Sequence, residues 1–128
     1  MALQDALDAA LDSVPDCKVV SYIDIASGLV LRKAVDAPVA QEILDRSAAV
    51  AQALWQGGSL AGFTGDHLGV TDLSEGVFVV KAPRQTYLFA RSPKYDDHAI
   101  CFRCGTEVLP EDLFKAAKPT IKAIADAF

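Results

Sequence analysis

The sequence predicts an α+β domain in which helices cover both faces of one antiparallel sheet, giving a three-layer α/β/α sandwich. The strand segments GVFVVKA, QTYLFAR and HAICFRC are apolar on both faces, so each face needs a cover. Short turns join successive strands, which favours antiparallel pairing. The order of elements is helix, strand, strand, helix, strand, strand, strand, helix. We therefore expect five strands and three helices in a single domain over residues 1–128.

The first three elements are a short helix and a β-hairpin. Residues 3 to 14 place Leu3, Leu7 and Leu11 at helical spacing, and Pro15 ends the helix. The segment CKVVSYIDIASGLVLRKAV then contains two β-branched runs, which predict strands near 17–25 and 29–34. Gly28 lies between them, where a tight turn needs a positive φ.

The second helix is expected over residues 38 to 56, from Pro38 to the Gly57-Gly58 pair. Its apolar residues form two adjacent lines, whereas a helix on one sheet needs a single arc of about 100°. These lines are Val39, Ile43, Val50 and Leu54, and Ala40, Leu44, Ala48, Ala51 and Trp55. The helix is therefore expected to pack on its own sheet and on a second surface.

Residues 57 to 74 are rich in glycine and have no clear period, so we expect a loop with room for one short strand. A phosphate-binding loop is disfavoured, because no Gly-Lys-Ser/Thr ending is present and Asp66 would repel an anion. His67 lies in this loop and is more simply a solvated side chain than a catalytic one.

The last helix is expected over residues 110 to 128. Its apolar side includes Leu113, Ala117, Ile121 and Ile124, and this phase continues through Pro119. The sequence predicts one helix that is kinked or broken near Ala116.

Composition excludes several functional classes. The formal charge of −5 disfavours binding to nucleic acid or to an anionic membrane, which needs clustered Lys and Arg. The first residues are acidic and lack the pattern of a signal peptide, and no apolar run is long enough for a transmembrane helix. Three cysteines without an export signal predict reduced thiols in the cytoplasm.

The order of elements, the chain length and the first hairpin, DIASGLVL from Asp24 to Leu31, together resemble the Roadblock/LC7 family of the profilin-like fold. The resemblance implies a sheet order of 2-1-5-4-3, with the second helix on one face and the terminal helices on the other. It also implies a homodimer in which second helices pack side by side and third strands meet edge to edge. Members are non-catalytic adaptors and scaffolds in signalling, and some are partners of small Ras-like GTPases.

We therefore predict a dimeric, non-enzymatic adaptor that binds or regulates a small Ras-like GTPase. The residues assigned to its dimer interface are Ile43, Ser47, Val50, Leu54, Trp55, Val77 and Val79. Trp55 can equally close the core. An alternative is a small-ligand sensory module of the PAS or GAF type, with a cavity between sheet and helices and the glycine-rich loop as its lid.

A third hypothesis concerns HAICFRC, residues 98 to 104, in which His98, Cys101 and Cys104 are spaced like a metal or dithiol site. Strand side chains alternate between faces, so Cys101 and Cys104 would point to opposite sides of the sheet. Cys17 and His67 are distant in the sequence. We therefore expect buried thiols and a surface or capping His98, and we assign no catalytic, cofactor-binding or metal-binding residue.

Overall fold

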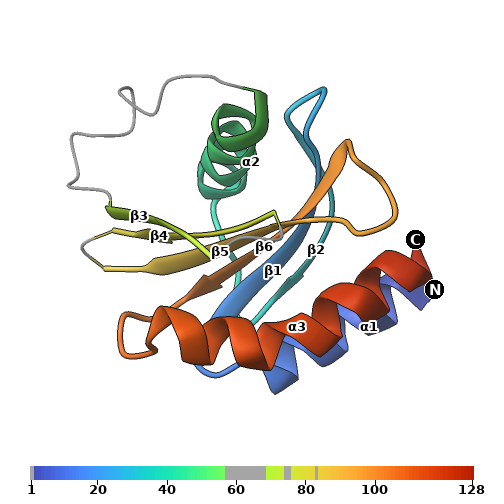
Figure 1. Cartoon of the computed structure of the whole chain (residues 1–128). Coiled ribbons are helices and arrows are strands. Elements are labelled where there is room, and N and C mark those ends of the chain that lie inside the picture. Colours follow the sequence, from blue (N-terminus) through green and yellow to red (C-terminus); the bar gives the residue numbers. More distant parts are fainter. Residues whose placement is uncertain (1, 57–68, 74–75, 83) are drawn as a thin grey trace.

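A computed structural model describes residues 2–56, 69–73, 76–82 and 84–128. Its described residues form three helices and one sheet with the strand order β2-β1-β6-β5-β4-β3 (Figure 1), and all neighbouring strands are antiparallel. In chain order the elements are α1 (Ala2–Ser13), β1 (Cys17–Asp24), β2 (Leu29–Val35), α2 (Gln41–Gln56), β3 (Gly69–Asp72), β4 (Val77–Lys81), β5 (Thr86–Arg91), β6 (His98–Cys104) and α3 (Pro110–Ala127).

The sheet has six strands, so the prediction of five strands in the order 2-1-5-4-3 is wrong in its count. The additional strand is β3, which lies within the glycine-rich stretch and pairs with β4 from Gly69–Lys81 to Asp72–Phe78. It contains four residues, and Val70 is its only large apolar side chain. A strand this short has too little alternation to be distinguished from a loop.

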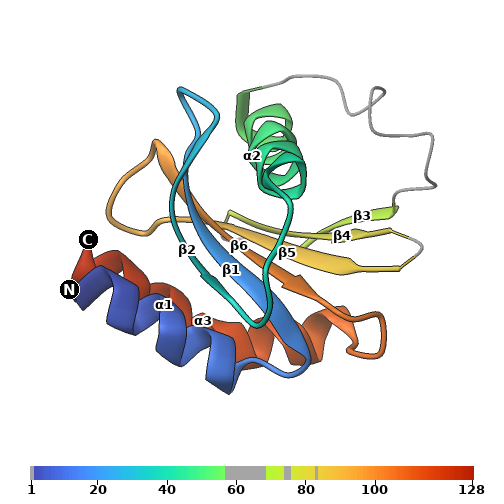
Figure 2. The ribbon, with the colours of Figure 1, turned by 180° about the vertical axis from the view of Figure 1, so that it is seen from behind.

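The helices cover the two faces of the sheet unequally, as Figures 1 and 2 show from opposite sides. Helices α1 and α3 lie side by side on one face, and α2 lies alone on the other. The buried side chains divide accordingly into one cluster under α1 and α3 and a smaller one under α2. This arrangement confirms the predicted three layers and the predicted distribution of helices.

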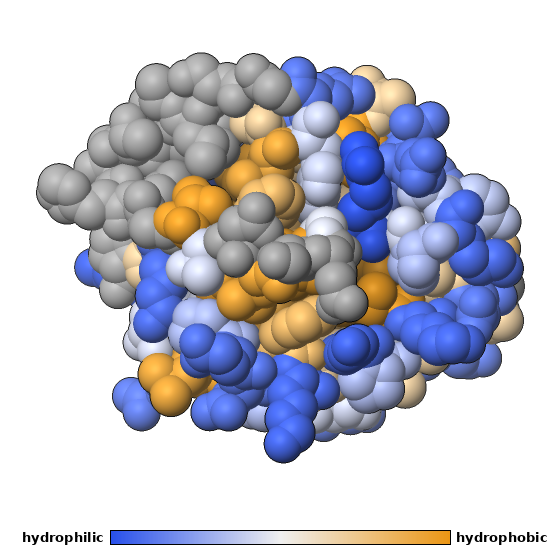
Figure 3. Space-filling model, in the orientation of Figure 1, coloured by the Kyte–Doolittle hydropathy of each residue, from blue (hydrophilic) through white to orange (hydrophobic). Residues whose placement is uncertain are grey.

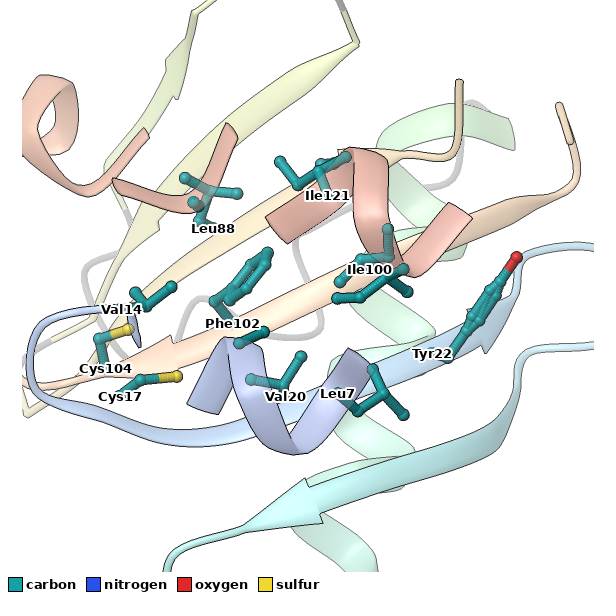
Figure 4. Packing of buried hydrophobic residues seen from close by; sticks show 14 of the residues in the cluster. Leu7, Val14, Cys17, Val20, Tyr22, Leu88, Ile100, Phe102, Cys104 and Ile121 are labelled. Carbon is teal, nitrogen blue, oxygen red and sulfur yellow. The ribbon is translucent and has the colours of Figure 1, made fainter. Parts of the chain in front are cut away.

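The larger cluster is centred on Phe102 of β6, which is fully buried. It is opposite Val20 of β1 and Leu88 of β5, so apolar side chains of three adjacent strands meet on one face. Figure 4 shows these side chains between the sheet and the two helices. The helices contribute fully buried Leu7 and Leu113.

Gly28 closes the turn between β1 and β2. Its φ is +71°, and its backbone N–H donates to the Asp24 carbonyl oxygen at 2.9 Å. The Ser27 hydroxyl donates to the Asp24 carboxylate at 2.8 Å, so the turn is also held by side chains. The Gln52 side chain of α2 lies against Gly28, where an added Cβ would be 2.7 Å from its Oε1. The predicted role of Gly28 is confirmed.

We expect Gly28→Ala to destabilise the protein more than Gly76→Ala does. Both glycines have a positive φ, which costs an alanine about 1–2 kcal/mol. At Gly76 the new Cβ would only touch the Arg91 Cβ at 3.4 Å, whereas at Gly28 it would displace Gln52 from its hydrogen bond to the Ala26 carbonyl. That bond contributes about 0.5–1.5 kcal/mol more. Urea unfolding measures the free energy of unfolding of both variants. Equal losses of stability in the two variants would show that the Gln52 side chain moves away without destabilising the protein.

Two helices differ from expectation at particular residues. Helix α2 begins at Gln41, three residues after Pro38, and its first turn is tightened by a bond from the Ile43 N–H to the Ala40 carbonyl. Helix α3 continues through Pro119 without a break at Ala116. Pro119 and Lys115 are both exposed, so the Lys115 carbonyl, which loses its helical donor, can bind water instead.

Candidate functional site

Helix α2 and the edge strand β3 border the surface that best fits a functional role. The inner side of α2 rests on the sheet through three fully or nearly fully buried residues, Leu44, Ala48 and Ala51. Ile23 of β1 and Phe89 of β5 belong to the cluster beneath them. Val50 also belongs to this cluster, and Leu54 and Trp55 pack against it, so the helix uses parts of both apolar lines in its contact with the sheet.

Ile43 and Leu54 of the first predicted apolar line and Trp55 of the second are only half-buried. The Trp55 ring meets the Phe78 ring of β4 edge to face, with centroids 5.6 Å apart, and the Arg91 guanidinium lies 6.0 Å from the Trp55 ring centroid. Aromatic and cation–π contacts of this kind fix the orientation of an indole. Trp55 is thus anchored to the sheet while part of it stays open to solvent.

Among the described strands, β3 lies at the end of the order and pairs with β4 alone. Val70 is opposite Val80, which belongs to the cluster under α2, so Val70 lies on the α2 face. Its side chain is 43% exposed. The outer N–H and C=O groups of an edge strand can pair with another chain. Within the described chain, this edge thus combines backbone groups that pair with no further strand and an apolar side chain.

The structure separates the seven residues predicted for the dimer interface into three groups. Ile43, Leu54 and Trp55 lie on the partly open side of α2. Ser47 and Val50 are on the same helix but are 6% and 7% exposed. Val77 and Val79 lie on the opposite face of the sheet, buried in the cluster under α1 and α3. The first group is therefore the part of the predicted set that presents partly exposed apolar side chains, and Val70 of the edge strand, which the sequence reasoning missed, adds a further one.

Cys101 and Cys104 lie on opposite faces of β6, as predicted. Cys101 belongs to the cluster under α2, and Cys104 to the cluster under α1 and α3. Burial raises the pKa of the Cys101 thiol to about 12, so this cysteine is a protonated, unreactive core residue. Within the described chain, no three His, Cys, Asp or Glu side chains gather closely enough to hold a metal ion.

His98 is not a simple surface or capping residue, which corrects that expectation. Its Nδ1 and the Tyr22 hydroxyl share a hydrogen bond of 2.8 Å. Its ring also contacts those of Tyr22, Tyr95 and Phe128 at centroid distances of 4.7 to 5.2 Å. These residues come from β1, the β5–β6 turn, β6 and the chain end, so the cluster joins α3 to the sheet. His67 lies outside the described residues.

The sensory-module alternative requires a cavity between sheet and helices. An open hollow of about 1010 Å³ lies between α3 and the strands β4 and β5. Its apolar lining includes Val77, Phe114 and Ile121, and lysines of α3 border it. Figure 3 shows apolar surface here above the hydrophilic side chains of α3. Most of the proposed glycine-rich lid, residues 57–68, lies outside the described residues, so the sensory module stays a prediction.

No described helix combines the length and the apolar character that crossing a membrane requires.

Known protein families and curated proteins were compared with this chain, and none of them matches. Solved structures do match. An MglB with a tetrameric arrangement is 15% identical, with a TM-score of 0.66, over 98% of this chain and 86% of that one. A Roadblock/LC7 domain from Streptomyces avermitilis is 16% identical, with a TM-score of 0.61, over 98% and 97%. LokiProfilin2 in complex with rabbit actin is 12% identical, with a TM-score of 0.71, over 98% and 97%. The predicted Roadblock/LC7, profilin-like fold is confirmed.

Proposed function

We propose that this protein is a non-catalytic homodimeric adaptor that binds or regulates a small Ras-like GTPase in the cytoplasm. The observation that carries the proposal is the outer edge of β3, which pairs with no further described strand, together with the partly exposed apolar side of α2. A second copy would align its own β3 along this edge and pack its α2 against Leu54 and Trp55. The buried Ser47, Val50, Val77 and Val79 would support these elements from within.

Two further observations support self-association. The MglB structure similar to this chain has a tetrameric arrangement, so this fold accommodates assembly in at least that protein. Val70, Leu54 and Trp55 are also apolar side chains from two elements that border one region, whereas scattered apolar residues need no partner. The GTPase partner rests on the resemblance of the DIASGLVL hairpin and the element order to Roadblock/LC7 domains.

We expect the wild-type protein to be a dimer at micromolar concentration. Val70→Asp should raise the dissociation constant of this dimer at least about tenfold, because burying a carboxylate at the strand edge makes the free energy of association less favourable by more than about 1.4 kcal/mol. Light scattering coupled to gel filtration measures the mass. The matched control is Leu109→Asp, because Leu109 is 60% exposed at the start of α3 and Asp is a good N-cap there. Circular dichroism would verify that both variants remain folded.

A wild-type monomer, or a Val70→Asp variant that dimerises as well as Leu109→Asp, would contradict the proposed interface. The partner is tested separately by titrating the wild-type dimer with small Ras-like GTPases of the source cell, each loaded with GDP or a non-hydrolysable GTP analogue. A dimer that binds none of them in either state would refute the GTPase role and leave the self-association intact.

A further inference from the structure

A third cysteine, distant in the sequence, lies directly opposite Cys104. In the ladder between β1 and β6, Cys17 pairs with Cys104, and the next pair is Val19 with Arg103. Two steps along β1 thus correspond to one step along β6, so Lys18 is an extra residue in a β-bulge. Without the bulge, Lys18 would be opposite Cys104. The irregularity therefore brings the two sulfurs to the same face.

The geometry of this pair is suitable for a disulfide. Directly opposed residues of an antiparallel pair have Cα atoms about 4.5–5.5 Å apart, and disulfides span Cα distances of about 4.4–6.8 Å. Both residues belong to the cluster under α1 and α3, and Figure 4 shows their sulfur atoms pointing to the same side of the sheet. Both are free thiols in this structure.

The two thiols are chemically unequal. Hydrogen bonding between the two side chains lowers the pKa of Cys17 and raises that of Cys104. The protonated Cys17 thiol donates to the Val19 carbonyl oxygen at 3.5 Å. Cys17 is also the more accessible of the two, because it is 8% exposed at the start of β1 whereas Cys104 is fully buried. A nucleophilic thiol is one that ionises and can be reached. Cys17 is therefore placed to react first and Cys104 to react second.

We propose that Cys17 and Cys104 form a peroxide-sensitive oxidation site that closes reversibly to an intramolecular disulfide. The Cys17 thiolate attacks one oxygen of hydrogen peroxide, the O–O bond breaks, and Cys17 sulfenic acid forms as hydroxide leaves and takes up a proton to become water. The Cys104 sulfur then attacks the sulfenic sulfur, the S–O bond breaks, and the hydroxyl leaves as water with the Cys104 proton. Two thiols lose two electrons in total, and one peroxide gains them.

Cys101 provides an internal control, because it lies on the other face of the same strand and its thiol is buried. We expect equimolar hydrogen peroxide to lower the thiol count of the folded wild-type protein from three to one, since two of the three cysteines join. The mass should fall by two hydrogens, and peptide mapping should link the Cys17 and Cys104 peptides. Dithiothreitol should restore all the thiols.

Variants separate the two steps. In Cys101→Ser the same bridge should form. In Cys104→Ser, Cys17 should stop at the sulfenic acid, which dimedone traps, and in Cys17→Ser both remaining thiols should persist. A bridge that contains Cys101, a bridge between two chains, or a wild-type protein that keeps all its thiols until urea unfolds it would each overturn the proposal. The wild-type and Cys101→Ser measurements decide it even if the other two variants do not fold.

Discussion

Phe102→Ala is expected to lower the free energy of unfolding by about 3–5 kcal/mol. Phe102 is fully buried in the central strand β6, between Val20 and Leu88 of the neighbouring strands and beneath both helices of that face. The substitution leaves a cavity in place of the phenyl ring. The sheet and the two helices keep the residues around this cavity in place, so they cannot move in to fill it. Domains of this kind are stable by only about 5–15 kcal/mol, so the loss is a large part of the total.

Urea unfolding followed by circular dichroism measures this loss. Phe102→Leu should lose less than half as much, because it keeps most of the apolar volume. Leu109→Ala, at a position that is 60% exposed, should change the stability by no more than about 0.5 kcal/mol. If Phe102→Ala lost no more than Leu109→Ala, Phe102 would not be at the centre of the core.

Cys101→Ser is expected to reduce the loss of stability that the protein shows between pH 9 and pH 12. Burial raises the pKa of the folded Cys101 thiol from its ordinary value of 9.0 to about 12. Below pH 9 the thiol is protonated in both states and contributes no pH dependence. Between these values only the unfolded chain loses the proton, so ionisation favours unfolding as the pH rises. The full difference is about 4 kcal/mol at pH 12.

The measurement is a series of urea unfolding curves of both proteins under reducing conditions from pH 7 to pH 12. Serine does not ionise in this range and is close in size to cysteine, so it can occupy this buried position. Tyr22, whose pKa burial also raises to about 12, is present in both proteins and cancels in the difference. Parallel curves for the two proteins across the whole range would show that the folded protein does not protect the Cys101 proton.

The sequence was sufficient to predict the three layers of the fold. Consecutive residues of a strand point to opposite faces of the sheet, so a run of consecutive apolar residues indicates that both faces are buried. Val79 and Val80 of β4, for example, point to opposite clusters. The same reasoning failed for β3, whose existence depends on pairing with β4 rather than on its own apolar pattern. Alternation places Val77 and Val79, two of the residues predicted for the dimer interface, on the face opposite α2.

The cysteines show the same limit. The regular alternation of β6 correctly separated Cys101 from Cys104. Cys17 was treated as too distant in the sequence to join Cys101 and Cys104 in one site. The bulge at Lys18 arises from the pairing of two strands, so it cannot be predicted from the sequence of either strand alone. Likewise, His98 was expected to be a simple surface residue, and its ring contact with Phe128 joins two residues that are thirty positions apart in the sequence.

Trp55 gives this protein a built-in optical reporter. It is the only tryptophan in the chain, so all of the indole fluorescence comes from the junction of α2 with β4. Its ring is half-buried and lies near the Arg91 guanidinium, so its emission wavelength depends on how much water reaches that junction. Anything that covers this region should shift the emission to the blue, whereas events at the aromatic cluster of Tyr22 and His98 on the other face should leave it unchanged. The α2 face can therefore be followed in the unlabelled protein.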